Sequence, residues 1–381
     1  MAGLPRLSEC SIDPSKPGFE QAASVYNILL QLEQEASEQS DKDLLQSARI
    51  LGAFLTFFSD FFWLFGPLPL EKITNGIVSR DRDPEPTPPT SADDSDASYY
   101  APVVKKLGGW YRHHIVRVYR SNKGPTPQPM SHPSRPSFDS LQAMMDEYLK
   151  GSGTNYDAAK RLALAREGFR CILTGHYDLS SCMKNEELMR RVNAAGLAYL
   201  PTECCHIFSQ ATVQNVSKET GAVTDDKRQY ATAVLAVMKS FGLDGLARDI
   251  ASPNGVHDLS NIMIMSTGLH TAFDLLHFWL EPARTANEYI ISGPASALLS
   301  HGLQPGTTVR FQDHSDRGLA LPDRRLLALH AACARVVHMS GAAEYFERWE
   351  DDDDQPPFLL PDGSSADRLV RRLNHELMIA S

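Results

Sequence analysis

The sequence is poor in cysteine and contains no apolar run long enough to cross a membrane. Its 381 residues include 6 cysteines, too few for a disulfide framework in a chain of this length. The most apolar stretch, residues 44–70, is interrupted by Arg49 and Asp60, so it offers no window of about 18 uncharged residues for a bilayer. We expect a buried helix or a helical hairpin there and no contact with a membrane.

The first 20 residues lack the pattern of a secretory signal. They contain Pro5, Glu9, Asp13 and Pro14, and they have no apolar core. We therefore expect an intracellular protein of the cytoplasm or nucleus, not a secreted one, with its cysteines reduced.

Positive charge is scarce as well, because 37 Lys and Arg face 47 Asp and Glu, a net charge of -10. This balance argues against a protein that coats nucleic acid with its whole surface. Residues 104–124 are the exception, since they contain no Asp or Glu and interleave basic with aromatic side chains, a mixture that suits phosphates and bases. We slightly favour the simpler interpretation, an exposed basic strand or helix face. The basic residues are Lys105, Lys106, Arg112, Arg117, Arg120 and Lys123.

The composition is that of a globular protein, with 42% hydrophobic and 22% charged residues and length enough for two or three domains. We predict an α+β fold in four regions. A helical N-terminal region covers 1–75, and residues 76–138 are Pro- and Ser-rich linkers that enclose the basic aromatic segment. A densely structured domain covers 139–280, and an α+β extension covers 281–381.

Caps and hydrophobic spacing predict the elements that follow residue 138. Asp139 or Ser140 can cap a helix that ends near Gly151. Further helices are predicted at 157–167, 185–195 and, after Thr224, over an apolar stripe that ends at Phe241. We predict a short strand at 170–175 that enters a turn at Gly175. Strand segments near 203–207 and 261–265 are predicted to pair antiparallel and to pack against a helix at about 267–280. The extension adds strands at 288–292 and 307–311 and a helix at 322–339.

A His-Ile pair is followed, far downstream, by an Asn and another His. His206 closes the first predicted strand, Asn261 precedes the second, and His270 comes nine residues after Asn261. His270 and Asp274 are four residues apart, so they project from one face of the predicted helix. An imidazole and a carboxylate at that spacing make a plausible pair of metal ligands.

The order His-Ile, Asn, His-x-x-Phe-Asp resembles that of the HNH endonucleases, above all the His-Ile variant found in fungal proteins. The Cys-x-x-Thr-Gly sequence that begins at Cys171 resembles the start of the same variant. The resemblance implies that residues 139–280 form an HNH nuclease domain, a ββα-metal unit with inserted helices. Such a unit hydrolyses phosphodiesters with one divalent cation.

The resemblance also implies roles for the residues. His206 is expected to be the general base, because an ordinary imidazole pKa near 6.5 lets it take a proton from water at neutral pH. His270 occupies the position of the metal-binding His, and Asp274 that of a further ligand in some HNH enzymes. Asn261 would hydrogen-bond across the hairpin and orient the loop that carries the base. The expected cofactor is magnesium, manganese or zinc, and the expected partner is nucleic acid, DNA in the first place.

Two residues leave alternatives open. Cys205 stands where many HNH enzymes have Asp or His as a metal ligand, so it is either a ligand that favours zinc or a small core residue. His277, seven residues after His270, could compete with Asp274 for the metal. A second hypothesis is a degenerate HNH scaffold that binds nucleic acid or a protein partner without cleavage.

Overall fold

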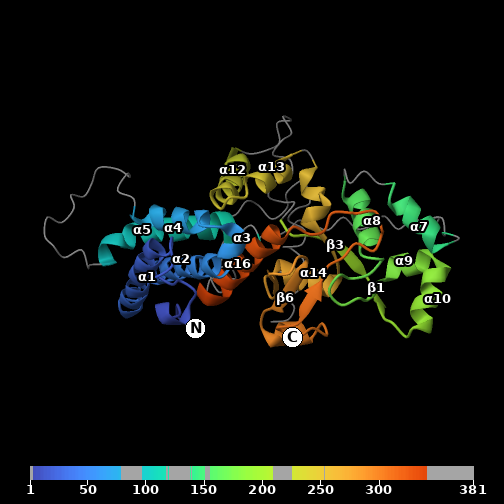
Figure 1. Cartoon of the computed structure of the whole chain (residues 1–381), viewed down its shortest axis with the longest axis horizontal. Coiled ribbons are helices and arrows are strands. Elements are labelled where there is room, and N and C mark those ends of the chain that lie inside the picture. Colours follow the sequence, from blue (N-terminus) through green and yellow to red (C-terminus); the bar gives the residue numbers. More distant parts are fainter. Residues whose placement is uncertain are drawn as a thin grey trace, which may run out of the picture. The chain divides into compact units, whose positions relative to one another are not determined.

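The computed structural model describes residues 3–78, 97–116, 119, 138, 140–150, 155–208, 225–252 and 254–340 (Figure 1). Most of both predicted linkers lies outside these ranges. So do Arg117, Arg120, Lys123 and the part of the predicted C-terminal extension that follows residue 340. The chain divides into two compact units. We call them the helical unit (Met1–Val118, Thr232–Ala247, Ala332–Asp353) and the mixed unit (Tyr119–Ala231, Arg248–Ala331, Asp354–Ser381).

The elements described in the helical unit are all helices, and the apolar stretch 44–70 supplies much of its core. α2 buries Phe54, Phe57 and Phe58, so the prediction of a buried helix is confirmed. No helix among the described residues is long and apolar enough to cross a membrane. The elements are η1 (Leu7–Glu9), α1 (Glu20–Glu38), α2 (Lys42–Asp60), α3 (Phe62–Phe65), α4 (Leu68–Val78), η2 (Ala97–Tyr100), α5 (Ala101–Tyr111), the π-helical η3 (Arg112–Val116) and parts of α12 (Asp225–Ser240), α13 (Asp244–Ala251) and α16 (Arg324–Ser340).

The described part of the basic aromatic segment is helical, as α5 and η3, and not a strand. Its buried residues recur at helical spacing, and the ring of Tyr111 stacks on that of Phe241 in the core. Lys105 Nζ lies 2.6 Å from Asp41 Oδ2, and Arg112 Nη1 lies 3.4 Å from Asp43 Oδ1. Two of the basic side chains in this segment are therefore paired with acidic residues of the same unit.

The mixed unit combines three small sheets with short helices, which confirms the α+β class. β1 (Tyr177–Asp178) and β2 (Tyr199–Leu200) are parallel. β3 (Thr202–His206) pairs antiparallel with β4 (Ile262–Ser266). β5 (Trp279–Pro282), β6 (Glu288–Ser292) and β7 (Thr308–Arg310) form an antiparallel meander. The helices are α7 (Leu141–Tyr148), α8 (Tyr156–Arg166), α9 (Leu179–Lys184), α10 (Glu186–Ala194), η4 (Gly255–His257), η5 (Leu259–Asn261), α14 (Thr267–Asp274) and α15 (Ala295–Leu299).

Side-chain caps position the helices of this unit where the sequence predicts them. Ser140, Asn155 and Asn185 accept hydrogen bonds from backbone N–H groups in the first turns of α7, α8 and α10. The strand predicted from residue 170 is reduced to one bridge between Arg170 and Tyr177, whereas the predicted turn at Gly175 is confirmed. Gly175 N donates to Cys171 O, and the chain turns back there because Gly175 adopts a left-handed conformation (φ +72°).

The helix predicted at 267–280 is too long, since α14 ends at Asp274. Leu276 adopts a left-handed conformation (φ +58°), and His277 N closes the helix on Ala272 O. Leu276 is fully buried and Trp279 begins β5, so packing and strand pairing override the helical pattern of the sequence.

The antiparallel strands β3 and β4 pack on α8, and a buried ion pair at the end of that helix binds β4. Arg166 donates to the carbonyl oxygens of Leu259 and Ile262, and its neighbour Glu167 accepts from Ile264 N at 2.8 Å. Both charged side chains are buried and 2.5 Å apart, so each stabilises the other away from water. The pair fixes β4 and therefore the start of α14.

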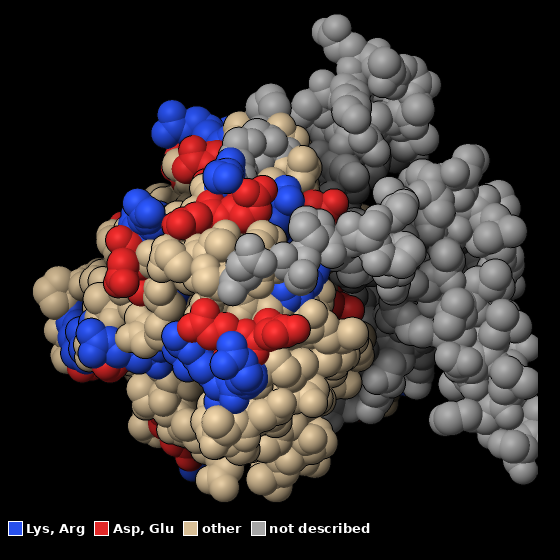
Figure 2. Space-filling model, turned by 90° about the vertical axis from the view of Figure 1, so that its right-hand side faces the viewer, with Lys and Arg blue, Asp and Glu red and all other residues tan. Residues whose placement is uncertain are grey.

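Acidic and basic side chains lie beside one another on the face of the mixed unit that carries α7 and α10 (Figure 2). Arg191 pairs with Glu187 at 2.5 Å on α10, and Arg317 lies 3.8 Å from Asp146 of α7. This face therefore has mixed charge, in keeping with the acidic composition of the chain.

Candidate active site

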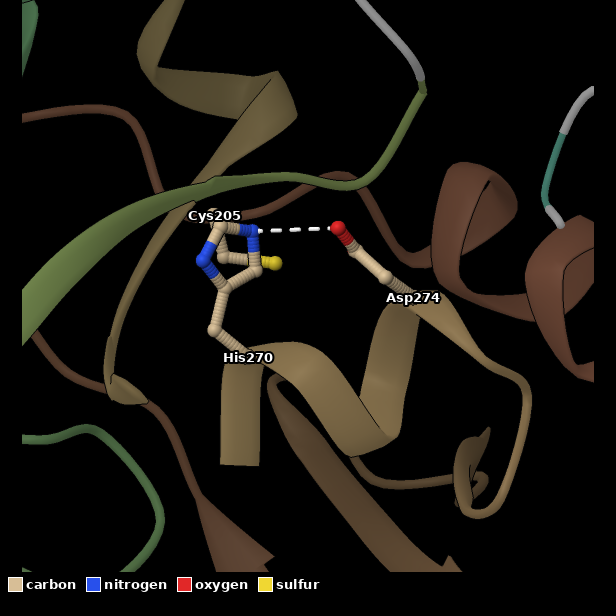
Figure 3. Close-up of side chains that lie close together, drawn as sticks. All are labelled: Cys205, His270 and Asp274. Carbon is tan, nitrogen blue, oxygen red and sulfur yellow. Dashed lines mark ion pairs between the residues drawn. The ribbon is translucent and has the colours of Figure 1, made fainter. Parts of the chain in front are cut away.

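α14 begins directly after β4 and carries two of the predicted site residues. His270 and Asp274 are one turn apart, and His270 Nε2 lies 3.3 Å from Asp274 Oδ2 (Figure 3). The helical spacing therefore brings this pair together as the sequence predicts.

Cys205 comes from β3 and completes a three-residue cluster with His270 and Asp274. One ligand atom from each residue (a sulfur, a nitrogen and an oxygen) lies within 4.8 Å of the others (Figure 3). Cys205 and His270 are buried, and Asp274 is partly exposed. Sulfur, imidazole nitrogen and carboxylate oxygen are all ligands of zinc, so the donor set fits a Zn²⁺ ion better than Mg²⁺.

Glu203 lies behind the cluster and fixes the histidine. It precedes Cys205 by two residues on β3, so the two side chains share a face of the strand. His270 Nδ1 donates to Glu203 Oε2 at 2.7 Å. With Nδ1 donating to Glu203, Nε2 is the nitrogen that remains for a metal ion, and it lies on the side of Asp274, as in histidines that bind metals.

The electrostatics of the cluster favour a cation. Burial by itself would lower the pKa of His270, but the charge of Cys205 and hydrogen bonds to Cys205 and Glu203 outweigh it and raise that pKa to about 10. The hydrogen bond from His270 in turn lowers the pKa of Glu203. A positive charge is thus stabilised at this position, and a metal ion can supply it in place of a proton.

His206 ends β3, and strand alternation turns it away from the face that carries Glu203 and Cys205. Its Nε2 lies 3.1 Å from Nδ1 of His257, which belongs to η4, and the ring of Tyr156 lies 6.1 Å away. His206 and His257 are 6% and 8% exposed. The structure therefore pairs His206 with a second histidine and does not place it in the cluster of Cys205, His270 and Asp274.

Asn261 connects the segments that carry the two histidines. Its Oδ1 accepts from Phe208 N at 2.7 Å, and its Nδ2 donates to Phe208 O at 3.1 Å, two residues after His206. The same Nδ2 donates to Val256 O at 2.9 Å, one residue before His257. One buried amide thus binds the backbone next to each member of the histidine pair.

Comparison with known families assigns this part of the chain. Residues 171–281 match the family model described as HNH endonuclease. They form an HNH domain. No curated protein and no solved structure matches the chain. The match contains β3, β4 and α14 with every residue of the cluster, and it indicates a nuclease-type function with binding of nucleic acid.

The structure shows where the two residues that the sequence left open lie in this HNH domain. Cys205 joins the potential ligands and is not merely a core residue, because the register of β3 turns it toward α14. His277 is exposed and lies beyond the end of α14, so the expectation that it competes with Asp274 is wrong. The helical spacing on which that expectation rested stops at Asp274.

The sequence analysis missed two residues of the HNH domain, Glu203 and His257. Glu203 could have been found from its spacing, because Glu-x-Cys on a strand places both side chains on one face. For His257 the signal was weak. Asn254-Gly255 marks a turn, but nothing in the sequence shows that the turn faces His206.

Proposed function

We propose that the HNH domain is a metal-dependent endonuclease that hydrolyses phosphodiester bonds of nucleic acid, DNA in the first place. The observation that carries the proposal is the convergence of Cys205, His270 and Asp274, backed by Glu203. A buried imidazole between a thiol and a carboxylate, with its second nitrogen held by another carboxylate, is an arrangement suited to a metal ion.

Zinc is the metal that this donor set favours, because thiolate sulfur is a poor ligand for magnesium. Three protein ligands leave a fourth position for water or substrate, as in other hydrolytic zinc sites. A divalent ion held there would polarise a phosphoryl oxygen and stabilise the departing oxygen.

His206 is the proposed general base. It takes a proton from the attacking water as the new P–O bond forms and the ester P–O bond breaks, and the departing oxygen takes its proton from solvent. Asn261 holds the backbone after the base through Phe208. This contact restricts the motion of His206 at the point where β3 ends.

The side chains of His206 and Cys205 leave β3 on opposite faces, although the two residues are neighbours in sequence. We therefore place the scissile phosphate across the end of β3, where a substrate can meet both faces.

A second candidate is an HNH scaffold that holds zinc for stability and binds nucleic acid or a protein without cutting. The observation in its favour is that His206 is buried and hydrogen-bonded to His257, apart from the metal cluster. The two candidates share the metal and differ in hydrolysis.

One experiment tests the proposal and separates the candidates. Metal-stripped wild type, His270→Ala and His277→Ala receive zinc, manganese or magnesium, and bound metal and nicking of supercoiled plasmid are measured together. We expect His270→Ala to lose both metal and nicking, with His277→Ala as the control that keeps them. Zinc binding without cleavage of DNA or RNA by wild type would support the scaffold. Equal metal binding in all three proteins would contradict the metal site.

A further inference from the structure

We propose that His257 is a positioning residue that holds the base His206 in a single tautomer. This role adds to the proposed function and depends on it. It starts from the contact of His206 Nε2 with His257 Nδ1 at 3.1 Å, between residues 51 positions apart in the chain. The side chain of His206 leaves β3 on the face opposite the metal cluster, and His257 lies on η4. The contact therefore has a role separate from metal binding.

The hydrogen bond needs one donor and one acceptor, because each neutral imidazole has one N–H and one lone pair. When His206 has taken a proton, both of its nitrogens carry hydrogen, and His257 Nδ1 must then be the acceptor. The bond survives the proton transfer only if Nε2 of His206 is the donor from the start. That arrangement leaves Nδ1 of His206 as the atom that accepts the proton from water, and His257 gains no proton itself.

The surroundings of His257 suit a neutral acceptor. The side chain is buried, and burial lowers its pKa, which favours the neutral form of the ring. Among the described residues, no acidic side chain forms a hydrogen bond or an ion pair with His257 that would favour its cationic form. A carboxylate in the same place would add a charge, whereas His257 fixes the ring of the base without one.

The turn that carries His257 is built with little freedom. Asn254 adopts a left-handed conformation (φ +64°) and accepts from His257 N at 2.8 Å. At Gly255 a Cβ atom would lie 1.7 Å from Asp249 O, so only glycine fits. Asn261 then ties Val256 and Phe208 to one amide group. The spacing of the two histidines is therefore set by backbone contacts that do not involve their rings.

Two variants of nearly equal shape test the inference. In His257→Asn the Oδ1 atom is bonded to Cγ, as Nδ1 is, and can accept from His206 Nε2. In His257→Leu a methyl group takes that place. We expect kcat for plasmid nicking to fall by about 100-fold in His257→Leu and to be largely retained in His257→Asn, with KM and zinc affinity little changed in both.

A readout that is independent of activity accompanies the kinetics. Nitrogen NMR shifts of the His206 imidazole should report the Nε2–H tautomer in wild type and His257→Asn and a mixture of tautomers in His257→Leu. Unchanged kcat and an unchanged tautomer in His257→Leu would overturn the inference. If wild type cleaves nothing, the proposed function fails, and the nitrogen shifts still decide whether His257 holds the tautomer.

Discussion

His270 Nδ1 lies 2.7 Å from Glu203 Oε2, and this contact aligns the imidazole of the candidate metal site. Loss of such an outer carboxylate lowers metal affinity by about 10- to 100-fold. We therefore expect Glu203→Ala to bind zinc that much more weakly and Glu203→Gln, whose amide oxygen can still accept, to lose less. Competition with a chromophoric chelator measures both. Glu288→Ala on β6 is the control, and equal affinities in Glu203→Ala and wild type would contradict the alignment.

Cys205 is expected to bind metal through its sulfur. Cobalt in place of zinc gives a thiolate-to-metal charge-transfer absorption only if a thiolate is a ligand. The band should be present in wild type and absent in Cys205→Ser. Cys204→Ala is a matched control, because the neighbouring cysteine is buried in the core on the other face of β3. A band that persists in Cys205→Ser would assign the sulfur to another residue.

Asn261 is expected to contribute to stability as well as to activity. Asn261→Ala removes hydrogen bonds from the backbone groups of Phe208 and Val256, and a buried group left unpaired costs about 1–3 kcal/mol. The free energy of unfolding, measured with urea, should therefore fall by at least the cost of one unpaired group, about 1–3 kcal/mol. The rate of cleavage should fall less than in His206→Ala, because the base is displaced and not removed. A stable, fully active Asn261→Ala would show that the clamp is dispensable.

His257 predicts a pH dependence of stability. Its pKa is lowered by burial, so the unfolded chain binds a proton at this residue more readily than the folded protein. Its contribution to stability is present above the ordinary pKa of 6.5 and is lost as the pH falls below it. The difference in unfolding free energy between wild type and His257→Asn should move against wild type on acidification. A difference that is constant from pH 8 to pH 5 would mean that His257 is not buried in its neutral form.

Local patterns in the sequence were enough to predict His270 and Asp274 as a pair. Ser266 ends a strand, and a helix follows. The helical repeat then places residues 270 and 274 on one face, independently of tertiary contacts. The same reasoning fails at His277, because a buried Leu276 and the pairing of β5 end the helix early. The pattern was correct only as far as the helix extends.

Cys205, Glu203 and His257 depend on contacts that the sequence does not encode locally. The face toward which Cys205 points follows from the register Cys205–Met263, which joins strands separated by more than 50 residues and by inserted helices. His257 lies beside His206 on a turn that Asn261 binds at Val256, and the same side chain binds Phe208 after His206. These residues needed the register and the turn geometry before any role could be assigned to them.

The measurement that tests the account most directly is plasmid nicking by metal-stripped protein titrated with zinc, in wild type and His206→Ala. Cleavage by wild type should rise with zinc and saturate at one ion per chain. His206→Ala should bind the same single ion and cleave about 100- to 10,000-fold more slowly, because a general base is lost and no ligand is. Equal rates in the two proteins, or zinc-loaded wild type that cleaves neither DNA nor RNA, would contradict the proposed nuclease.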